Sequence, residues 1–201
     1  MSTRTDASGG QTAERRQFVA KLLSSLPDAL VVTGLGSASY DVFAAGDRDN
    51  NYYLWGAMGG ATSLALGLAI AQPEKSVVVI TGDGEQLMGI GSLATIAAKQ
   101  PRNLTIVVLD NGHFGETGMQ RSHTSLGTDL VAVAKGFGIA NSFVVASIER
   151  CADIAHHAVA RKQPTFVRVS IEANEPPRAL PPRDGVYVKN RFRAALGFAP
   201  F

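Results

Sequence analysis

The segment VVVITGDGEQLM, from Val77 to Met88, joins an apolar run to an aspartate between two glycines and then to a stretch with helical spacing. Four consecutive apolar residues predict a strand that is buried on both faces, as in a parallel sheet. A turn would need Gly82 and Gly84 but not the acid between them. An anion-binding loop at a helix start would exclude the acid unless a cation also lay there. The segment therefore predicts a buried strand that leads into a site for an anion and a cation.

Similar apolar runs recur along the chain and alternate with helix-like segments. The other expected strands are 29–32, 104–109, 143–145 and 166–169, and the expected helices are 13–25, 58–71, 87–99, 128–137, 148–162 and 186–196. This alternation predicts an α/β fold with a single doubly wound, mostly parallel sheet and helices on both faces. Ligands of such sheets bind beyond the carboxyl ends of the strands, so we expect the site among 33–39, 55–60, 81–85 and 110–120.

The length of 201 residues and the hydrophobic share of 45% suit one domain with a sizeable core. Residues 1–12 are polar and rich in Ser and Gly, and we expect them to form a disordered leader. Residues 13–201 are expected to form the domain, which ends in a Pro-rich strap over 174–185 and a final helix.

Charge and cysteine content exclude several classes of function. The net charge of +2 comes from scattered basic residues, so we expect no nucleic-acid partner. The single cysteine, Cys151, excludes an internal disulfide framework and any all-cysteine metal site within the chain. No apolar run approaches the roughly 18 residues of a membrane helix, and the N-terminus does not resemble a secretory signal. We therefore expect no membrane partner and a cytoplasmic location.

A magnesium site is predicted from the residues that follow two expected neighbouring strands. Asp83 follows the strand at 77–80, and Asn111 lies 28 residues later, after one helix and one strand. Mg²⁺ is typically held by one or two carboxylates or amides together with phosphate oxygens and water. Gly112 would free a nearby carbonyl, expected to be that of His113, as a third ligand. Asp83 would then be a metal ligand under a diphosphate.

The motif GDGEQLMGIGSLATIAAKQPRNLTIVVLDNG (82–112) resembles the thiamine diphosphate signature, and GAMGGATSLALGLA (56–69) resembles the cofactor-side segment of the decarboxylase branch. The stretches VVTGLGSASYDVF, LDNGHFGETGMQ and VKNRFRAAL look most like sulfopyruvate decarboxylase β subunits and the C-terminal half of phosphonopyruvate decarboxylases. The likeness extends over about residues 13–198. It implies the thiamine diphosphate-binding fold and a carboxy-lyase that uses thiamine diphosphate and Mg²⁺ on a small anionic 2-oxoacid.

The resemblance also implies roles for individual residues. Asp83 and Asn111 would bind Mg²⁺ through their side chains, and His113 through its carbonyl. Met58 would force the cofactor into its bent shape, and the carbonyl of Gly56 would accept a hydrogen bond from the aminopyrimidine. The implied catalytic set is Met58, Gly56 and His113. The implied cofactor-binding set is Gly36, Ser37, Ser39, Gly56, Met58, Gly82, Asp83, Gly84, Glu85, Asn111, His113 and Gly115.

Two features depart from a complete enzyme of this kind. Glu85 replaces the small or apolar residue that is common after this Gly-Asp-Gly, so its side chain either points away or repels diphosphate. No glutamate of the chain matches the one that activates the pyrimidine ring in the family. We therefore expect a separate pyrimidine-binding α subunit that supplies this glutamate, in an α₂β₂ or larger heteromer.

Several alternatives stay open at the level of sequence. The chain could belong to a carboligase or lyase related to acetolactate synthase, or be a non-catalytic module with a vestigial cofactor pocket. The single cysteine counts against a 2-oxoacid:ferredoxin oxidoreductase β subunit. The loop 113–120 is either a solvated surface loop or a substrate-side loop that orders over the cofactor. An anionic substrate group could be contacted by His113, His123 or Arg121. The alternative is that these are ordinary surface residues.

Overall fold

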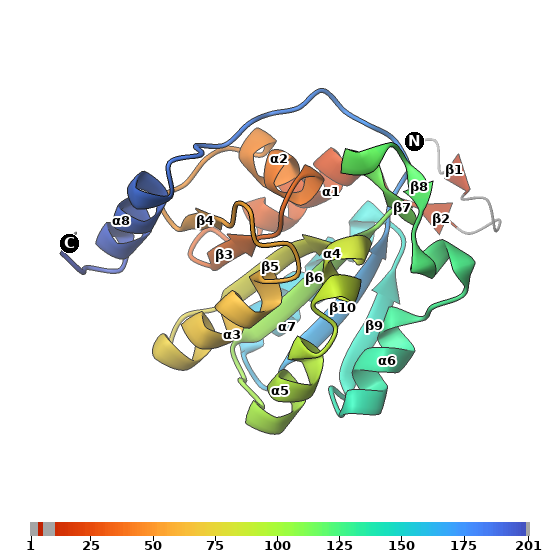
Figure 1. Cartoon of the computed structure of the whole chain (residues 1–201). Helices are drawn as coiled ribbons and strands as arrows, with labels where there is room; N and C mark the ends of the chain where they lie inside the picture. Colours follow the sequence, from red (N-terminus) through yellow and green to blue (C-terminus); the bar gives the residue numbers. More distant parts are fainter. Residues whose placement is uncertain (1–3, 6–10, 200–201) are drawn as a thin grey trace.

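In the computed structural model, which describes residues 4–5 and 11–199, six strands form one sheet (Figure 1). Their order is β4 (Asn51–Tyr53), β3 (Leu30–Thr33), β5 (Val77–Gly82), β6 (Leu104–Asp110), β10 (Thr165–Ser170) and β9 (Asn141–Val145). All neighbouring strands of this sheet pair in parallel. The predicted α/β fold with a parallel sheet is confirmed.

Helices cover both faces of the sheet because alternate strand residues point to opposite sides. Val78 and Ile80 of β5 join a core with α1 (Arg15–Ser24), α2 (Ser37–Ala44) and α7 (Cys151–Ala160). Val77 and Val79 join the opposite core, to which α3 (Ala61–Ala71), α5 (Ser92–Lys99) and α6 (Leu130–Phe137) contribute. Figure 1 shows α3, α5 and α6 in front of the sheet and α7 behind it. The doubly wound arrangement is therefore confirmed.

Acidic side chains cap three of the helices. Glu14 accepts hydrogen bonds from the N–H groups of the first turn of α1. Asp129 does the same for α6, and Asp184 for α8 (Gly185–Ala195). Such caps satisfy backbone donors that have no partner within the helix and favour a negative charge at its N-terminus. They explain why these helices begin where they do.

The helix expected over 87–99 is two helices in the structure, α4 (Asp83–Met88) and α5, separated at 89–91. A side chain at Gly89 would meet the carbonyl oxygen of Gly59 at 2.1 Å, so the two backbones touch at this break. The helix expected over 58–71 begins only at Ala61, because Gly59 has a φ of +86°. Met58 therefore lies before α3, in a segment that packs against the end of α4.

Some elements were not predicted from the sequence. They are the strand β4, the helix α2, the short strands β7 (His113–Phe114) and β8 (Gln120–Arg121), and the 3-10 turns Gly115–Thr117, His123–Leu126 and Ile148–Arg150. Within the expected leader, Arg4–Thr5 (β1) pairs with Gln11–Thr12 (β2). The remaining positions of that leader, 1–3 and 6–10, lie outside the described residues, so the expectation of disorder is not tested there.

The Pro-rich strap runs from β10 to α8 and arcs above α2 in Figure 1. Trp55 anchors it, because the indole Nε1–H donates to the carbonyl of Pro182 at 2.8 Å and the Arg183 guanidinium lies 5.3 Å from the indole ring. Beyond the strap, Phe192 of α8 packs edge-on against Tyr52 of β4, with 5.5 Å between ring centroids. No helix within the described ranges is long and apolar enough to cross a membrane.

Candidate functional site

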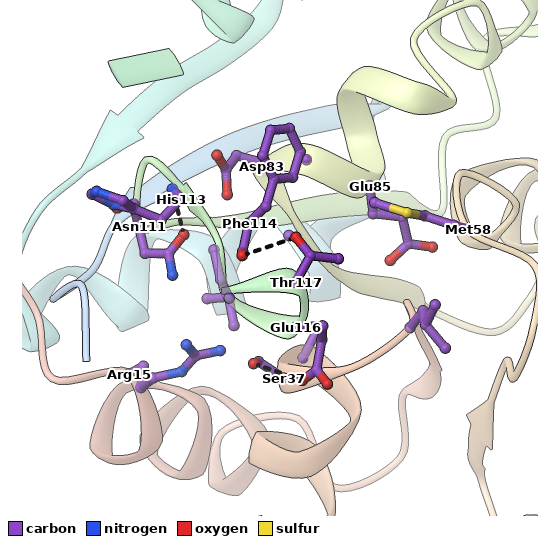
Figure 2. Close-up of a pocket in the computed structure, with 16 residues that line it drawn as sticks. Arg15, Ser37, Met58, Asp83, Glu85, Asn111, His113, Phe114, Glu116 and Thr117 are labelled. Atoms are coloured by element: carbon purple, nitrogen blue, oxygen red, sulfur yellow. Dashed lines mark hydrogen bonds between the residues drawn. The ribbon is translucent and has the colours of Figure 1, made fainter. Parts of the chain in front are cut away.

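A cavity lies beyond the carboxyl ends of β3, β5 and β6, where the fold class predicts a ligand site. Figure 2 shows the side chains that converge on it. Its lining residues are Arg15, Leu35, Ser37, Ala38, Met58, Gly82, Asp83, Gly84, Glu85, Leu109, Asn111, His113, Phe114, Gly115, Glu116 and Thr117. Residues from five separate parts of the chain therefore meet at one site.

Asp83 is the first residue of α4 and is only 2% exposed. The Ser122 hydroxyl donates a hydrogen bond to its Oδ2, and the Thr124 Oγ1 lies 3.1 Å from the same oxygen. Burial raises the pKa of Asp83 to about 6, and the neighbouring Asp110 carboxylate adds to the rise. A buried carboxylate that resists ionisation in this way is suited to a cation, which would compensate its charge.

Asp110, at the end of β6, is held by three donors. Arg168 forms an ion pair with its Oδ2, Thr124 donates to Oδ1 at 2.8 Å, and the Gly112 N–H donates to the same oxygen at 2.9 Å. The Arg168 guanidinium balances the charge of Asp110. Asp83 has no cationic side chain among its hydrogen-bond partners in the described chain, which distinguishes the two carboxylates.

Asn111 and His113 belong to one tight turn after β6. The Asn111 Oδ1 accepts from the backbone N–H of His113 at 3.0 Å, and the His113 Nδ1 lies 2.7 Å from the Asn111 carbonyl oxygen. Gly112 has a φ of +69°, a conformation that favours glycine. Because a carbonyl oxygen only accepts, Nδ1 of His113 carries the proton in this contact. The turn presents the Asn111 amide and His113 on the wall that also holds Asp83.

The oxygen atoms on this wall suit a hard divalent cation that also binds an oxygen-rich ligand. Among the described residues there is no group of three or more His, Cys, Asp or Glu side chains that could hold a metal by themselves. Asp83 and Asn111 supply one carboxylate and one amide oxygen, which leaves positions for phosphate oxygens and water. That shortage of protein ligands is the usual condition of a Mg²⁺ site that is completed by a phosphorylated ligand.

Glu85 points into the fold, and the sequence could not decide between this orientation and repulsion of diphosphate. Its carboxylate accepts from the Thr81 hydroxyl at 2.9 Å and lies near backbone N–H groups of Leu35, Gly59 and Ala61. Burial raises the pKa of Glu85, and these hydrogen bonds offset the rise only in part. The side chain thus links the loop after β3, the end of β5 and the start of α3, next to Met58 in Figure 2.

Two glycines near Glu85 are required by neighbouring side chains. A Cβ at Gly34 would lie 1.5 Å from the Glu85 Oε2, and a Cβ at Gly84 would lie 2.5 Å from the Phe114 ring. The sequence assigned Gly84 to the approach of a diphosphate. The structure adds a second reason, because Phe114 packs directly on the first turn of α4.

The loop that carries Phe114 is tied to the opposite side of the cavity by Glu116. Its carboxylate lies 3.5 Å from the Ser37 hydroxyl and 3.2 Å from the Arg178 guanidinium of the strap. The loop 113–117 is therefore held between α2 and the strap, although Glu116 itself is partly exposed. The candidates Arg121 and His123 lie beyond it and are exposed, with Arg121 bonded to Ser125 and the His123 ring 6.3 Å from that of Phe114.

Three of the expected cofactor-binding residues do not line the cavity. Gly36 caps α2 with a φ of +75°. The Ser39 hydroxyl is buried, bonded to Thr33 Oγ1 at 2.5 Å and to the Gly34 carbonyl at 2.6 Å, so it stabilises the loop from inside and does not face the cavity. Gly56 is exposed and has a φ of +71°. The other expected residues, Ser37, Met58, Gly82, Asp83, Gly84, Glu85, Asn111, His113 and Gly115, are brought together.

The site also contains residues that sequence reasoning missed. Ser122 and Thr124 bond to Asp83, Asp110 lies beside it, and Arg15 reaches the cavity from α1. Asp110 could have been suspected from its place next to Asn111. The other three carry no local signal, because their spacing to the motif follows no helix or strand period.

The family described as "Thiamine pyrophosphate enzyme, C-terminal TPP binding domain" matches residues 36–169. The chain belongs to the thiamine pyrophosphate enzyme family. Thiamine pyrophosphate is another name for thiamine diphosphate, so the resemblance inferred from the motifs is confirmed. The matched residues include all of the cavity wall except Arg15 and Leu35.

Several similar sequences are those of decarboxylases. Phosphonopyruvate decarboxylase of Streptomyces viridochromogenes is 38% identical over 200 residues, which are 95% of this chain and 49% of that protein. Sulfopyruvate decarboxylase subunit beta of Methanothermobacter thermautotrophicus is 37% identical over 161 residues, 79% of this chain and 82% of that subunit. The chain thus spans about half the length of the first relative and most of the second.

A thiamine diphosphate-dependent 4-hydroxybenzoylformate decarboxylase of Rhodococcus jostii has a similar structure. The TM-score is 0.68 at 21% identity, and the match covers 88% of this chain and 35% of the other. At this identity the likeness concerns the fold, which agrees with the parallel sheet described above.

Proposed function

We propose that the chain is the diphosphate-binding subunit of a split 2-oxoacid decarboxylase that uses thiamine diphosphate and Mg²⁺, of the sulfopyruvate or phosphonopyruvate type. The observation that carries the proposal is the buried Asp83 facing the Asn111 turn at the end of neighbouring strands, within a thiamine pyrophosphate-binding domain. The similarity to sulfopyruvate decarboxylase beta subunits supports the split arrangement.

The chain's own residues would bind and orient the cofactor. Asp83 and Asn111 would hold Mg²⁺ with the carbonyl of His113, and the N–H groups of Gly84 and Glu85 at the start of α4 would face the diphosphate. When bound, thiamine diphosphate supplies the electron sink for loss of CO₂ from a 2-oxoacid.

The remaining expected roles lie on other parts of the wall. Gly36, Ser37 and the loop after β3 would approach the diphosphate from the α2 side, and Gly115 from the 113–117 loop. Met58 would support the two rings, and Gly56 would accept from the aminopyrimidine. Nε2 of His113 is left as a proton acceptor, because Nδ1 is engaged with Asn111.

A partner subunit would complete the end of the site at Met58 and Gly56, where the two rings of the cofactor would lie. We call this the ring end. The two glutamates of the cavity are engaged elsewhere, Glu85 with Thr81 and Glu116 with Arg178. Neither matches the activating glutamate of the family. We therefore assign the activating glutamate to a separate α subunit, in an α₂β₂ or larger complex.

The test is recovery of the tagged chain from its native source under mild conditions, followed by mass spectrometry of the intact complex. The complex is then assayed for CO₂ release from sulfopyruvate, phosphonopyruvate and pyruvate, with and without an acceptor aldehyde. Mg²⁺- and cofactor-dependent decarboxylation by a heteromer is expected. Robust decarboxylation by the pure chain alone would contradict the split arrangement. Formation of a carbon–carbon ligation product with the aldehyde would instead identify the enzyme as a carboligase.

A further inference from the structure

Arg15 is a charged residue of the cavity wall that lies outside the matched family domain. It is the first residue of α1, is 4% exposed and lines the same cavity as Asp83 and Ser37. In Figure 2 its guanidinium extends into the site from the α1 side, on the side of Asn111 and opposite Met58. Arginines are almost never this buried unless they have a partner, so the contacts of this one call for an explanation.

The described contacts of Arg15 leave most of its donors unused. Its Nε donates to the Asp41 Oδ2 at 2.7 Å. No other acceptor for the guanidinium is found within residues 4–5 and 11–199. A guanidinium has five N–H donors in a planar fork, and only one of them is engaged. The unused donors make this place suited to a ligand with several acceptor oxygens.

The local charge also favours an anion. Asp41 is shared, because the Arg16 Nε lies 3.5 Å from its Oδ1, so two cations face one carboxylate. Asp110 is paired with Arg168 and Glu116 with Arg178, while Asp83 belongs to the wall assigned to Mg²⁺ and Glu85 is turned inward to Thr81. The α1 side of the cavity therefore carries a surplus positive charge next to the wall assigned to Mg²⁺.

We propose that the terminal nitrogens of Arg15 bind phosphate oxygens of the cofactor diphosphate, next to the wall assigned to Mg²⁺. This inference rests on the proposed function, and it adds a charged side chain to a site that is otherwise built from backbone N–H groups and a metal. The guanidinium fork matches phosphate oxygens in a bidentate manner, and the Asp41 contact fixes its orientation. Asp41 and Arg16 act only through Arg15.

The experiment is isothermal titration calorimetry on the full chain, with Mg²⁺ and with thiamine diphosphate, inorganic pyrophosphate or unphosphorylated thiamine at up to millimolar concentration. Arg15→Gln alone would leave Asp41 buried beside a weakened partner and could fail to fold. The comparison is therefore between Asp41→Asn, which keeps the guanidinium, and the double variant Arg15→Gln/Asp41→Asn, which leaves a neutral pair. Circular dichroism verifies folding of both.

The double variant is expected to bind thiamine diphosphate and pyrophosphate about 10- to 100-fold more weakly than Asp41→Asn, which is the range of charge-assisted hydrogen bonds. Binding of unphosphorylated thiamine should not differ between the two. Arg16→Gln is the matched control, since Arg16 contacts Asp41 without lining the cavity, and its effect should stay below about threefold.

Equal pyrophosphate affinity in Asp41→Asn and the double variant would overturn the role of Arg15 and leave the proposed function intact. Binding of pyrophosphate but not of thiamine diphosphate by the wild-type chain, with loss in the double variant, would uphold the anion contact and contradict the proposed function. A folded wild-type chain that binds neither ligand, both alone and in the recovered heteromer, would overturn both.

Discussion

The two ends of the cavity differ in how completely this chain builds them. At one end, Asp83 and Arg15 are buried, and hydroxyls, an amide turn and ion pairs surround them. At the other end, Met58 is 41% exposed, and just outside the cavity lining Gly56 is exposed, with no atom beyond its two chain neighbours within 4 Å of where its Cβ would lie. The first end is preorganised for an ionic ligand, whereas the second is an open apolar surface.

This difference indicates where a second chain would contribute. Charged groups must be fixed by the fold before a ligand arrives, because reorganising buried dipoles and charges is costly. An exposed methionine needs no such fixing and can be covered on assembly. The incomplete ring end is thus consistent with the proposed position of a partner subunit over Met58.

The largest effect is expected from Asp83→Ala at the polar end. Loss of the carboxylate removes the only charged ligand proposed for Mg²⁺, so affinity for thiamine diphosphate in the presence of Mg²⁺ should fall by more than about 100-fold. Calorimetry with and without Mg²⁺ measures this. Asp28→Ala, at an exposed site away from the cavity, is the control. Unchanged cofactor affinity in Asp83→Ala would show that the metal assignment is wrong.

The next effect concerns Gly34 beneath the ring end. Its Cβ would collide with the buried Glu85 carboxylate at 1.5 Å, so Gly34→Ala should lower the free energy of unfolding by about 3 kcal/mol. In the Glu85→Ala variant the space for a Cβ at Gly34 is free, so Gly34→Ala should lower the free energy of unfolding by about 1 kcal/mol or less. Chemical denaturation of the four proteins gives the coupling energy.

Gly67→Ala is the matched control for that cycle, since no atom lies within 4 Å of the added Cβ in α3. It should stabilise the chain by up to about 1 kcal/mol, as expected for glycine in a helix. Equal losses from Gly34→Ala in both backgrounds would mean that Glu85 does not occupy the position described.

A change of pH should have a smaller effect on the free energy of unfolding. The pKa of Asp83 in the folded, metal-free chain is about 6, above its ordinary value of 3.8. A raised pKa means that the neutral carboxyl favours folding at low pH and that this contribution is lost as the pH rises through about 6. The stability of Asp83→Asn relative to wild type should therefore rise by about 2 kcal/mol between pH 4.5 and pH 7.5. Thermal unfolding with a chelator measures the difference at both pH values.

Addition of Mg²⁺ and thiamine diphosphate should reverse that rise at pH 7.5, because only the wild-type carboxylate gains a cation. If the stability difference between wild type and Asp83→Asn did not vary between pH 4.5 and 7.5, the burial of an ionisable Asp83 would be in error.

The smallest effect on stability is expected for Met58→Ala at the open end. An exposed side chain loses little burial, so the free energy of unfolding of the isolated chain should change by less than about 0.5 kcal/mol. In the assembled enzyme, turnover should nevertheless fall at least tenfold, because ring support is lost. Met88→Ala, on a methionine that is 64% exposed and outside the cavity lining, should leave turnover unchanged. Equal turnover in both variants would contradict the role of Met58.

Much of the fold could be predicted from the sequence because its core strands are short apolar runs. β5, β6 and β10 are buried on both faces, and such runs have an unambiguous pattern. β4 and α2 were missed, since Asn51–Tyr53 is short and Ser37–Ala44 follows a glycine-rich loop without a side-chain cap. The break between α4 and α5 depends on contact between Gly89 and Gly59, which belong to distant parts of the chain.

The fold class and the adjacency of Asp83 and Asn111 follow from the sequence pattern, because parallel strands place successive carboxyl ends at one edge of the sheet. The contacts of Ser122 and Thr124 with Asp83, the inward turn of Glu85 and the entry of Arg15 into the cavity are seen only in the folded chain. The physical reason is that strand burial follows a local period, whereas hydrogen bonds and rotamers of these side chains depend on neighbours brought together from distant parts of the chain.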